Sequence, residues 1–148
     1  MVCELATFER AREEVTASAA DIETLLFEGS ATPSGAPAAY AYVIDDDVEG
    51  SPHQLAAFAL WGVRASTWKG QYGIYLEDLY VREDRRHLGH GKALLERLAL
   101  ECEERGYPRF EWSVLDWNEP AAAFYRDFGA SPLNEWVLWR RTFERKTL

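Results

Sequence analysis

The strongest constraint on how this chain folds is a glycine-containing turn, residues 86–91, that separates segments of opposite periodicity. Residues 74–81 precede it and are rich in β-branched and aromatic side chains, which predicts a strand. Residues 92–100 follow it, and apolar residues recur at helical spacing from Leu94 to Cys102. The free N–H groups and the dipole at a helix start favour an anion. The turn therefore predicts a site for a phosphate-bearing ligand.

Three kinds of phosphate loop compete for this turn. The Gly91-Lys92 pair lacks both the earlier Gly and the following Ser or Thr of a nucleoside-triphosphate loop, which excludes that class. A dinucleotide loop needs Gly or Ala where Leu94 stands, although Glu111 lies where a ribose-binding acid is expected. The pattern Arg-x-x-Gly-x-Gly over 86–91 fits the loop type that holds the pyrophosphate of coenzyme A. Taken alone, the turn is equally compatible with an ordinary strand-to-helix connection.

Composition limits the class of protein. The chain has 148 residues, 47% of them hydrophobic, which predicts a single globular domain over 1–148. The net charge of −9 argues against nucleic-acid and anionic-membrane partners and suits a cationic substrate, although solubility alone explains it equally well. Cys3 and Cys102 give no disulfide framework, and we find no signal peptide or apolar run that would span a membrane. We therefore expect a cytoplasmic protein.

The other elements follow from periodicity and turn residues and complete an α/β fold with a mixed sheet. We expect two helices within 3–27, the second capped by Thr16 or Ser18. The remaining expected elements are strands at 38–44 and 54–61 around an acidic turn at 45–50, a connector at 66–73, a strand at 110–115, a helix at 120–127 and a last strand at 136–142.

Four ordered segments, 75–81, 86–91, 114–121 and 124–130, together resemble the GNAT acetyltransferases. Within that superfamily they resemble the spermidine/spermine and thialysine (diamine) acetyltransferase branch, which the Leu-Glu-Asp strand and the Trp-Asn-Glu-Pro turn favour. The resemblance covers roughly residues 60 to 140 well and the first 55 loosely. It implies the GNAT fold, but this chain is helical in character from its start, so the family's first strand is expected to be missing.

The resemblance implies direct transfer of an acetyl group from acetyl-CoA to an amine. Because a free primary amine has a pKa of about 10 and a thiol one of about 8.5, the reaction needs a base and an acid. The resemblance assigns the general acid to Tyr125 and the base or amine anchor to Glu77. The alternative interpretation of Tyr125 is an aromatic residue of the core. Glu77 and Asp78 are adjacent carboxylates in an apolar strand, where we expect one on each side of the sheet. The alternative for Asp78 is a solvent-facing position.

The resemblance also supplies coenzyme contacts. The backbone of Leu79, Tyr80 and Val81 would pair with the pantetheine arm like an added strand. The remaining expected contacts are the pyrophosphate-binding residues Arg86, His87, Leu88, Gly89, His90, Gly91 and Lys92, and Asn118, Glu119, Pro120, Ala121 and Arg126 along the pantetheine and nucleotide. The alternative interpretation of Arg86 and Arg126 is that both are exposed cations without a ligand. Asn118 is also a good helix cap, and this role is compatible with a coenzyme contact.

Two further sets of residues bear on the site. Glu111, Trp112 and Ser113 are expected in the wall of the substrate site, although Trp112 is otherwise a core residue. His87 stands where the family usually has Gly, so a positive φ there would impose strain. We expect no metal site, because the histidines lack fitting carboxylate or thiol partners.

These observations predict an acetyl-CoA-dependent N-acetyltransferase for a small cationic acceptor: a diamine, a polyamine or a lysine-like amino acid. Two alternatives remain open, a protein N-terminal or lysine acetyltransferase and a non-catalytic CoA-binding regulatory module. Homodimerisation is expected from the family resemblance only.

Overall fold

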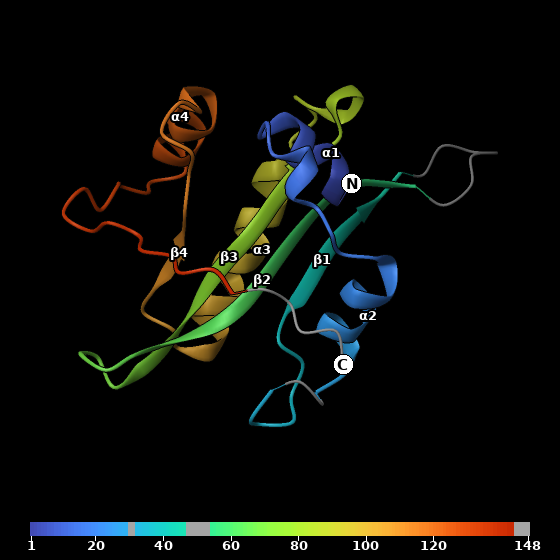
Figure 1. The fold of residues 1–148 in the computed structure, drawn as a ribbon. Coiled ribbons are helices and arrows are strands. Elements are labelled where there is room, and N and C mark those ends of the chain that lie inside the picture. Colours follow the sequence, from blue (N-terminus) through green and yellow to red (C-terminus); the bar gives the residue numbers. More distant parts are fainter. Residues whose placement is uncertain (30–31, 47–53, 144–148) are drawn as a thin grey trace. The chain divides into compact units, whose positions relative to one another are not determined.

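The computed structural model describes residues 1–29, 32–46 and 54–143, and the chain forms two compact units, Met1–Leu115 and Asp116–Leu148. The first unit holds a mixed sheet in the order β1-β2-β3-β4 with helices on both faces (Figure 1). The α/β class with a mixed sheet is confirmed, and helix α1 (Val2–Phe8) precedes every strand described. That residues 1–148 form a single domain stays a prediction.

Three antiparallel strands and one parallel strand build the sheet. β1 (Tyr40–Asp45) pairs antiparallel with β2 (Leu55–Ser66), and β2 pairs antiparallel with β3 (Gln71–Val81). β4 (Phe110–Trp112) pairs parallel with β3. The acidic turn expected at 45–50 lies mostly outside the described residues.

Local sequence signals explain where the helices begin and end. Ser18 caps α2 (Ala19–Phe27) in a capping box with Asp21, because each residue's side chain accepts a hydrogen bond from the other's backbone N–H. α3 (His90–Arg105) is flanked by the cap residues Gly89 and Gly106, and both glycines have positive φ. Short 3₁₀ turns, η1 (Arg12–Glu14) and η2 (Glu83–Arg85), precede α2 and α3.

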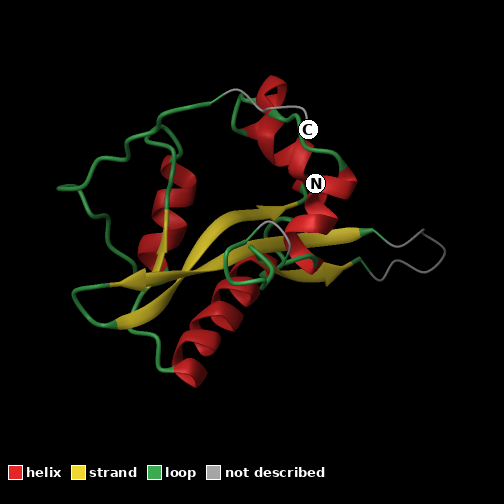
Figure 2. Ribbon diagram, turned by 60° about the horizontal axis from the view of Figure 1, so that its bottom comes forward, coloured by secondary structure: helices red, strands yellow, loops and turns green. Residues whose placement is uncertain are grey.

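Different helices cover the two faces of the sheet (Figure 2). On one face, Leu5 of α1 packs with Phe58 of β2 and Tyr80 of β3, all less than a tenth exposed. On the other face, α3 contributes the buried Leu94, Leu95 and Leu98. Each face is therefore apolar, as a sheet covered on both sides requires.

Three expected boundaries are wrong. Residues 66–73 are not a long connector, because β2 runs to Ser66 and β3 starts at Gln71. The strand at 110–115 ends at Trp112. Residues 136–142 form no strand, and Trp139 within them is 90% exposed. A strand needs a neighbouring backbone to pair with, which the composition of one segment does not supply.

The second unit is described by itself. Its helix α4 (Glu119–Asp127) starts at Asn118, whose side-chain oxygen accepts a hydrogen bond from the Ala121 N–H at 3.3 Å. Pro120 stands in the first helical turn, where its missing N–H costs nothing. In the described part of the chain, no helix is both long and apolar enough to cross a membrane.

We predict that Leu95→Ala lowers the free energy of unfolding by about 2–5 kcal/mol, because Leu95 is fully buried under the sheet and its removal leaves a cavity. Urea denaturation followed by far-UV circular dichroism measures the change. Leu100→Ala on the same helix is the control, because Leu100 is 44% exposed, and we expect it to shift stability far less. Equal losses in the two variants would contradict the assigned core.

Candidate functional site

A bulge in β3 sets the position of both candidate carboxylates. Leu60 of β2 pairs with Asp78, but the next residue, Trp61, pairs with Leu76, so Glu77 is an extra residue without a partner on β2. Asp78 and Tyr80 thereby share a face with Leu60 and Phe58, the face that α1 covers.

This geometry corrects one expectation. Glu77 and Asp78 do not simply alternate across a regular pleat, because the bulge takes Glu77 out of the alternation. Glu77 is exposed, whereas Asp78 is partly buried on the α1 face, so the solvent-facing alternative for Asp78 is not what the fold adopts.

The bulge also marks the point where two parallel strands part. β4 pairs with β3 at Ile74, Tyr75 and Leu76, and no pairing continues beyond that point. β3 itself runs on to Val81. The segment that includes Leu79, Tyr80 and Val81 therefore has β2 on one side and no strand of the described sheet on the other. Such an open edge can accept an extended ligand by strand addition.

Asp78 has an unusual electrostatic environment. Burial, followed by the negative charges of Glu9 and Glu77, raises its pKa from 3.8 to about 6. Glu9 caps the C-terminal end of α1, and its position beside Asp78 was not predicted from the sequence. The only signal that could have found it is its place in a charged run after an apolar stripe, which is also typical of a solvated helix face. The site is therefore a place where a cation would be stabilised.

The turn at 86–91 has the geometry of an anion cradle. His87 and Gly89 adopt positive φ values of 62° and 85°. No described residue accepts a hydrogen bond from the N–H groups of residues 89–92, which begin α3. A Cβ added at Gly89 would meet nothing within 4 Å, so the space above the turn is open. Consecutive free N–H groups at a helix start suit a phosphate.

Arg86 is held within the protein. Its guanidinium lies 5.2 Å from the Phe8 ring centroid and 5.9 Å from that of Tyr80, and its Nε donates to the Val81 carbonyl at 3.2 Å. The half-buried Arg86 is therefore not the freely exposed cation that the sequence left as an alternative. Its contacts connect α1 to the start of the cradle.

The expected substrate wall is partly occupied by internal contacts. Glu111 lies 3.9 Å from Arg64 and 3.7 Å from Arg109, so its charge is shared with two arginines of the same unit. The Ser113 hydroxyl lies 2.8 Å from that of Tyr75. Trp112 packs edge-on against Phe110, with ring centroids 4.7 Å apart. A role for Glu111 as an acceptor contact would have to compete with its arginines.

Within the second unit, α4 carries the candidate acid. Tyr125 is partly buried, and its ring centroid lies 5.4 Å from that of Phe124. Arg126 pairs with Glu119 at 2.6 Å across the exposed face of the helix. Arg126 is the residue of α4 that was expected to reach a nucleotide phosphate, and here its charge is paired with Glu119.

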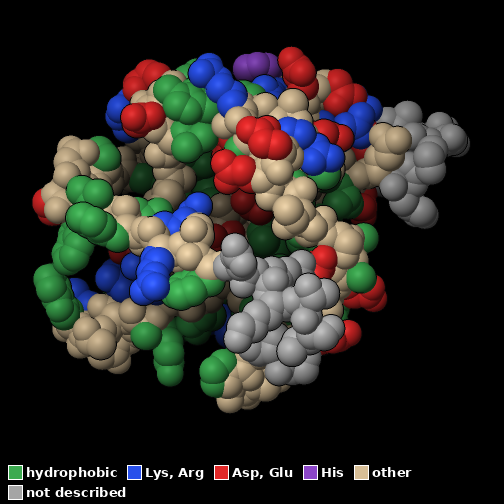
Figure 3. Space-filling model, in the orientation of Figure 1, with side chains coloured by type: hydrophobic (Ala, Val, Ile, Leu, Met, Phe, Trp, Pro, Cys, Tyr) green, Lys and Arg blue, Asp and Glu red, His purple; other side chains and the backbone are tan. Residues whose placement is uncertain are grey.

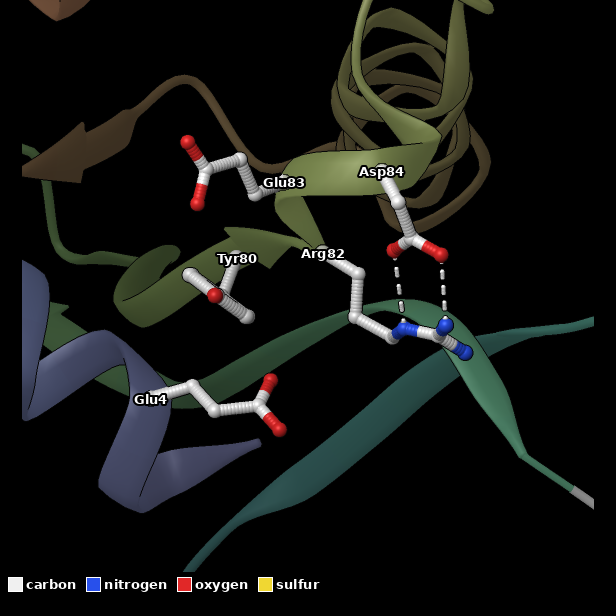
Figure 4. Close-up of a pocket in the computed structure, with 5 residues that line it drawn as sticks. All are labelled: Glu4, Tyr80, Arg82, Glu83 and Asp84. Carbon is white, nitrogen blue, oxygen red and sulfur yellow. Dashed lines mark hydrogen bonds and ion pairs between the residues drawn. The ribbon is translucent and has the colours of Figure 1, made fainter.

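A pocket of about 470 Å³ lies beside the strand end that leads into the cradle (Figure 4). Glu4, Tyr80, Arg82, Glu83 and Asp84 line it, and Arg82 is bound by Asp84. In the space-filling view, acidic and basic side chains intermingle around α1 (Figure 3). The pocket therefore offers carboxylates, while its arginine is already paired.

The sequence of this chain matches a known protein family. The family model described as "Acetyltransferase (GNAT) family" matches residues 6–130. A thialysine N-epsilon-acetyltransferase of Caenorhabditis elegans is 33% identical over 129 residues, which cover 84% of this chain and 69% of that one. An L-ornithine N5-acetyltransferase of Arabidopsis thaliana is 39% identical over 88 residues, 60% of this chain but only 39% of the relative.

A solved structure agrees at the level of the fold. An integron cassette protein from the mobile metagenome of V. cholerae superposes with a TM-score of 0.71 at 23% identity, over 95% of this chain and 82% of that one.

We predict that Asp78→Asn stabilises the protein at pH 8, by up to about 3 kcal/mol. The native pKa of Asp78 is raised to about 6, so its ionised form opposes folding once the pH exceeds the unfolded value near 3.8. The gain in the free energy of unfolding should be complete above pH 6, shrink between pH 6 and pH 4, and vanish below pH 4. Chemical denaturation across this range measures it, with the exposed Asp116→Asn as control. A gain that does not depend on pH would refute the assignment.

Proposed function

This chain belongs to the GNAT family of acetyltransferases, and we propose that it transfers the acetyl group of acetyl-CoA to a primary amine of a small cationic acceptor. The observation that carries this proposal is the pair of carboxylates, Glu77 and Asp78, at the bulge where β3 parts from β4. The same strand leads through η2 into the anion cradle. An acidic centre beside an open strand edge suits an amine acceptor and an extended coenzyme.

The residues of the first unit fit coenzyme A. The free N–H groups of residues 89–92 would hold the pyrophosphate, together with those of His87 and Leu88 in the same turn. The backbone of Leu79, Tyr80 and Val81 would pair with the pantetheine arm at the open edge of β3. Arg86 would support this loop through its contacts with α1. Bound there, acetyl-CoA supplies a thioester that an amine can attack directly.

The second unit would add contacts identified from the family motif. Asn118 would hydrogen-bond the pantetheine while capping α4, with Glu119, Pro120 and Ala121 alongside. Arg126 would reach a nucleotide phosphate only by leaving Glu119.

The proposed chemistry needs two proton transfers. Glu77, exposed at the bulge, would take the proton of the attacking ammonium or anchor the amine, directly or through water. Tyr125 would donate a proton to the leaving thiolate, an assignment that rests on the Phe124-Tyr125 motif. Asp78, with its pKa near 6, would be ionised at neutral pH and favour a cationic acceptor.

A small amine is the acceptor class that the observations favour. The charges of Glu9 and Glu77 act on the partly buried Asp78, so a cation bound beside it would relieve their repulsion. The relatives named for thialysine and L-ornithine act on small amines, which supports a diamine, a polyamine or a lysine-like amino acid. Glu111, Trp112 and Ser113 would form part of the acceptor wall. We further propose a homodimer in the cytoplasm.

We predict that acetyl transfer, followed by thiol release over a panel of spermidine, putrescine, thialysine, lysine and a peptide, selects one small amine. Tyr125→Phe should reduce its turnover by about 10²-fold or more, because the thiolate would leave without a proton donor. Tyr72→Phe, on an exposed tyrosine of β3, is the matched control. Turnover of the peptide alone would indicate a protein acetyltransferase, and CoA binding without any turnover would leave a regulatory module.

We also predict that Gly89→Ala weakens CoA binding by about tenfold, because an alanine at φ 85° costs about 1–2 kcal/mol and the loop would leave its cradle conformation. Isothermal titration with CoA measures this. Gly70→Ala introduces a similar strain, at φ 61°, in the turn between β2 and β3, so it should lower stability and leave CoA affinity unchanged. Unchanged affinity in Gly89→Ala would remove the cradle from the proposed site.

A further inference from the structure

Asp46, just after β1, binds two arginines that flank the connection from β3 to the cradle. The Nη1 of Arg82 lies 3.0 Å from one carboxylate oxygen of Asp46, and the Nε of Arg85 lies 2.9 and 3.0 Å from the two oxygens. The Asp46 side chain is only 11% exposed. One carboxylate thus joins the β1 end of the sheet to both ends of the η2 segment.

Further contacts make this arrangement a network, which we call the Asp46 clamp: Asp46, Gln54, Arg82, Asp84 and Arg85. The Gln54 side-chain oxygen accepts from Arg82 at 2.9 Å, and the Gln54 carbonyl accepts from the Asp46 N–H at 2.7 Å. Asp84 binds Arg82 at 2.7 Å and Arg85 at 3.1 Å, the first of these being drawn in Figure 4. Both guanidiniums are therefore committed to internal carboxylates.

The last residue of the clamp, Arg85, lies two positions before His87, a strained residue of the cradle. Arg86 follows Arg85, and His87 has a φ of 62°, which costs energy for any residue with a Cβ. A strained conformation persists only where the surrounding structure determines it. On the far side of His87 that structure is α3, and on the near side it is the clamp together with Arg86, which is packed between Phe8 and Tyr80.

We propose that Asp46 is a positioning residue for the coenzyme loop: it holds Arg82 and Arg85 so that the cradle exists before the coenzyme arrives. This inference rests on the proposed function of the cradle. Asp46 contributes affinity for the coenzyme without touching it, because a loop held in its binding conformation does not spend binding energy on ordering. Loss of the clamp reduces the fraction of molecules with a competent loop, and the apparent dissociation constant rises in proportion.

The test measures CoA affinity and steady-state kinetics for Asp46→Asn, Arg85→Gln and the double variant, with Asp45→Asn as the control. Asp45 is the exposed neighbour of Asp46, so its variant changes the net charge equally. If a tenth of the molecules keep a competent loop, each single variant raises the CoA dissociation constant and the acetyl-CoA KM about tenfold. The double variant should lose less CoA affinity than the sum of the two single losses, because both single variants break the same Asp46–Arg85 ion pair.

A second readout separates positioning from general loss of structure. At saturating acetyl-CoA, kcat and the KM for the amine should equal the wild-type values. Asp46→Glu, which retains the charge, should recover part of the CoA affinity, and it replaces Asp46→Asn if that variant does not fold.

Three results would overturn the proposal. Asp46→Asn could match Asp45→Asn in CoA affinity, or Arg85→Gln could weaken binding while Asp46→Asn does not, which would make Arg85 a direct ligand. Additive losses in the double variant would also overturn it. A wild-type chain that binds CoA no better than Gly89→Ala would instead refute the proposed function of the cradle, and the clamp's role with it.

Discussion

The bulge at Glu77 is the constraint on which the candidate site depends. An extra residue in β3 moves Asp78 and Tyr80 to the face of the sheet that α1 covers, while Ile74 and Leu76 stay level with Trp61 and Val63 on the other face. The same point ends the pairing of β3 with β4. The bulge thus positions the carboxylates, and it coincides with the point beyond which β3 has an open edge. Without it, the strand would continue as an ordinary member of a covered sheet.

The charges near this strand are organised by internal pairing. Arg82 and Arg85 are bound by Asp46 and Asp84, and Arg86 is stacked on two aromatic rings. In the proposed site, backbone N–H groups at the start of α3 would therefore hold the anion, because the nearby arginines are already engaged within the protein. Asp78 has the opposite character, because burial and neighbouring carboxylates leave its charge uncompensated. The strand consequently carries the proposed acceptor site and leads to the proposed coenzyme site.

Much of this arrangement could be predicted from the sequence because the signals are local. Glycine spacing and helical periodicity identified the turn before α3, and the structure supplies the positive φ, 62°, on which strain at His87 was conditional. Contacts between distant segments could not be predicted. Nothing in the sequence near Asp46 indicates Arg85 as its partner, and nothing at Glu9 indicates Asp78. The strand expected at 136–142 was wrong for a related reason, because pairing depends on a neighbour and apolar composition alone cannot supply one.

By itself, the sequence determined the class of fold, the position of the turn that leads into α3 and the residue types proposed for acetyl transfer. These follow from interactions within a few residues along the chain: periodicity, capping and the conformational freedom of glycine. The tertiary structure decided which face Asp78 occupies, where β3 parts from β4, and that Glu111 and Arg86 are engaged within the protein. Register and charge pairing join segments far apart in the chain, so only the packed sheet and its helices can fix them.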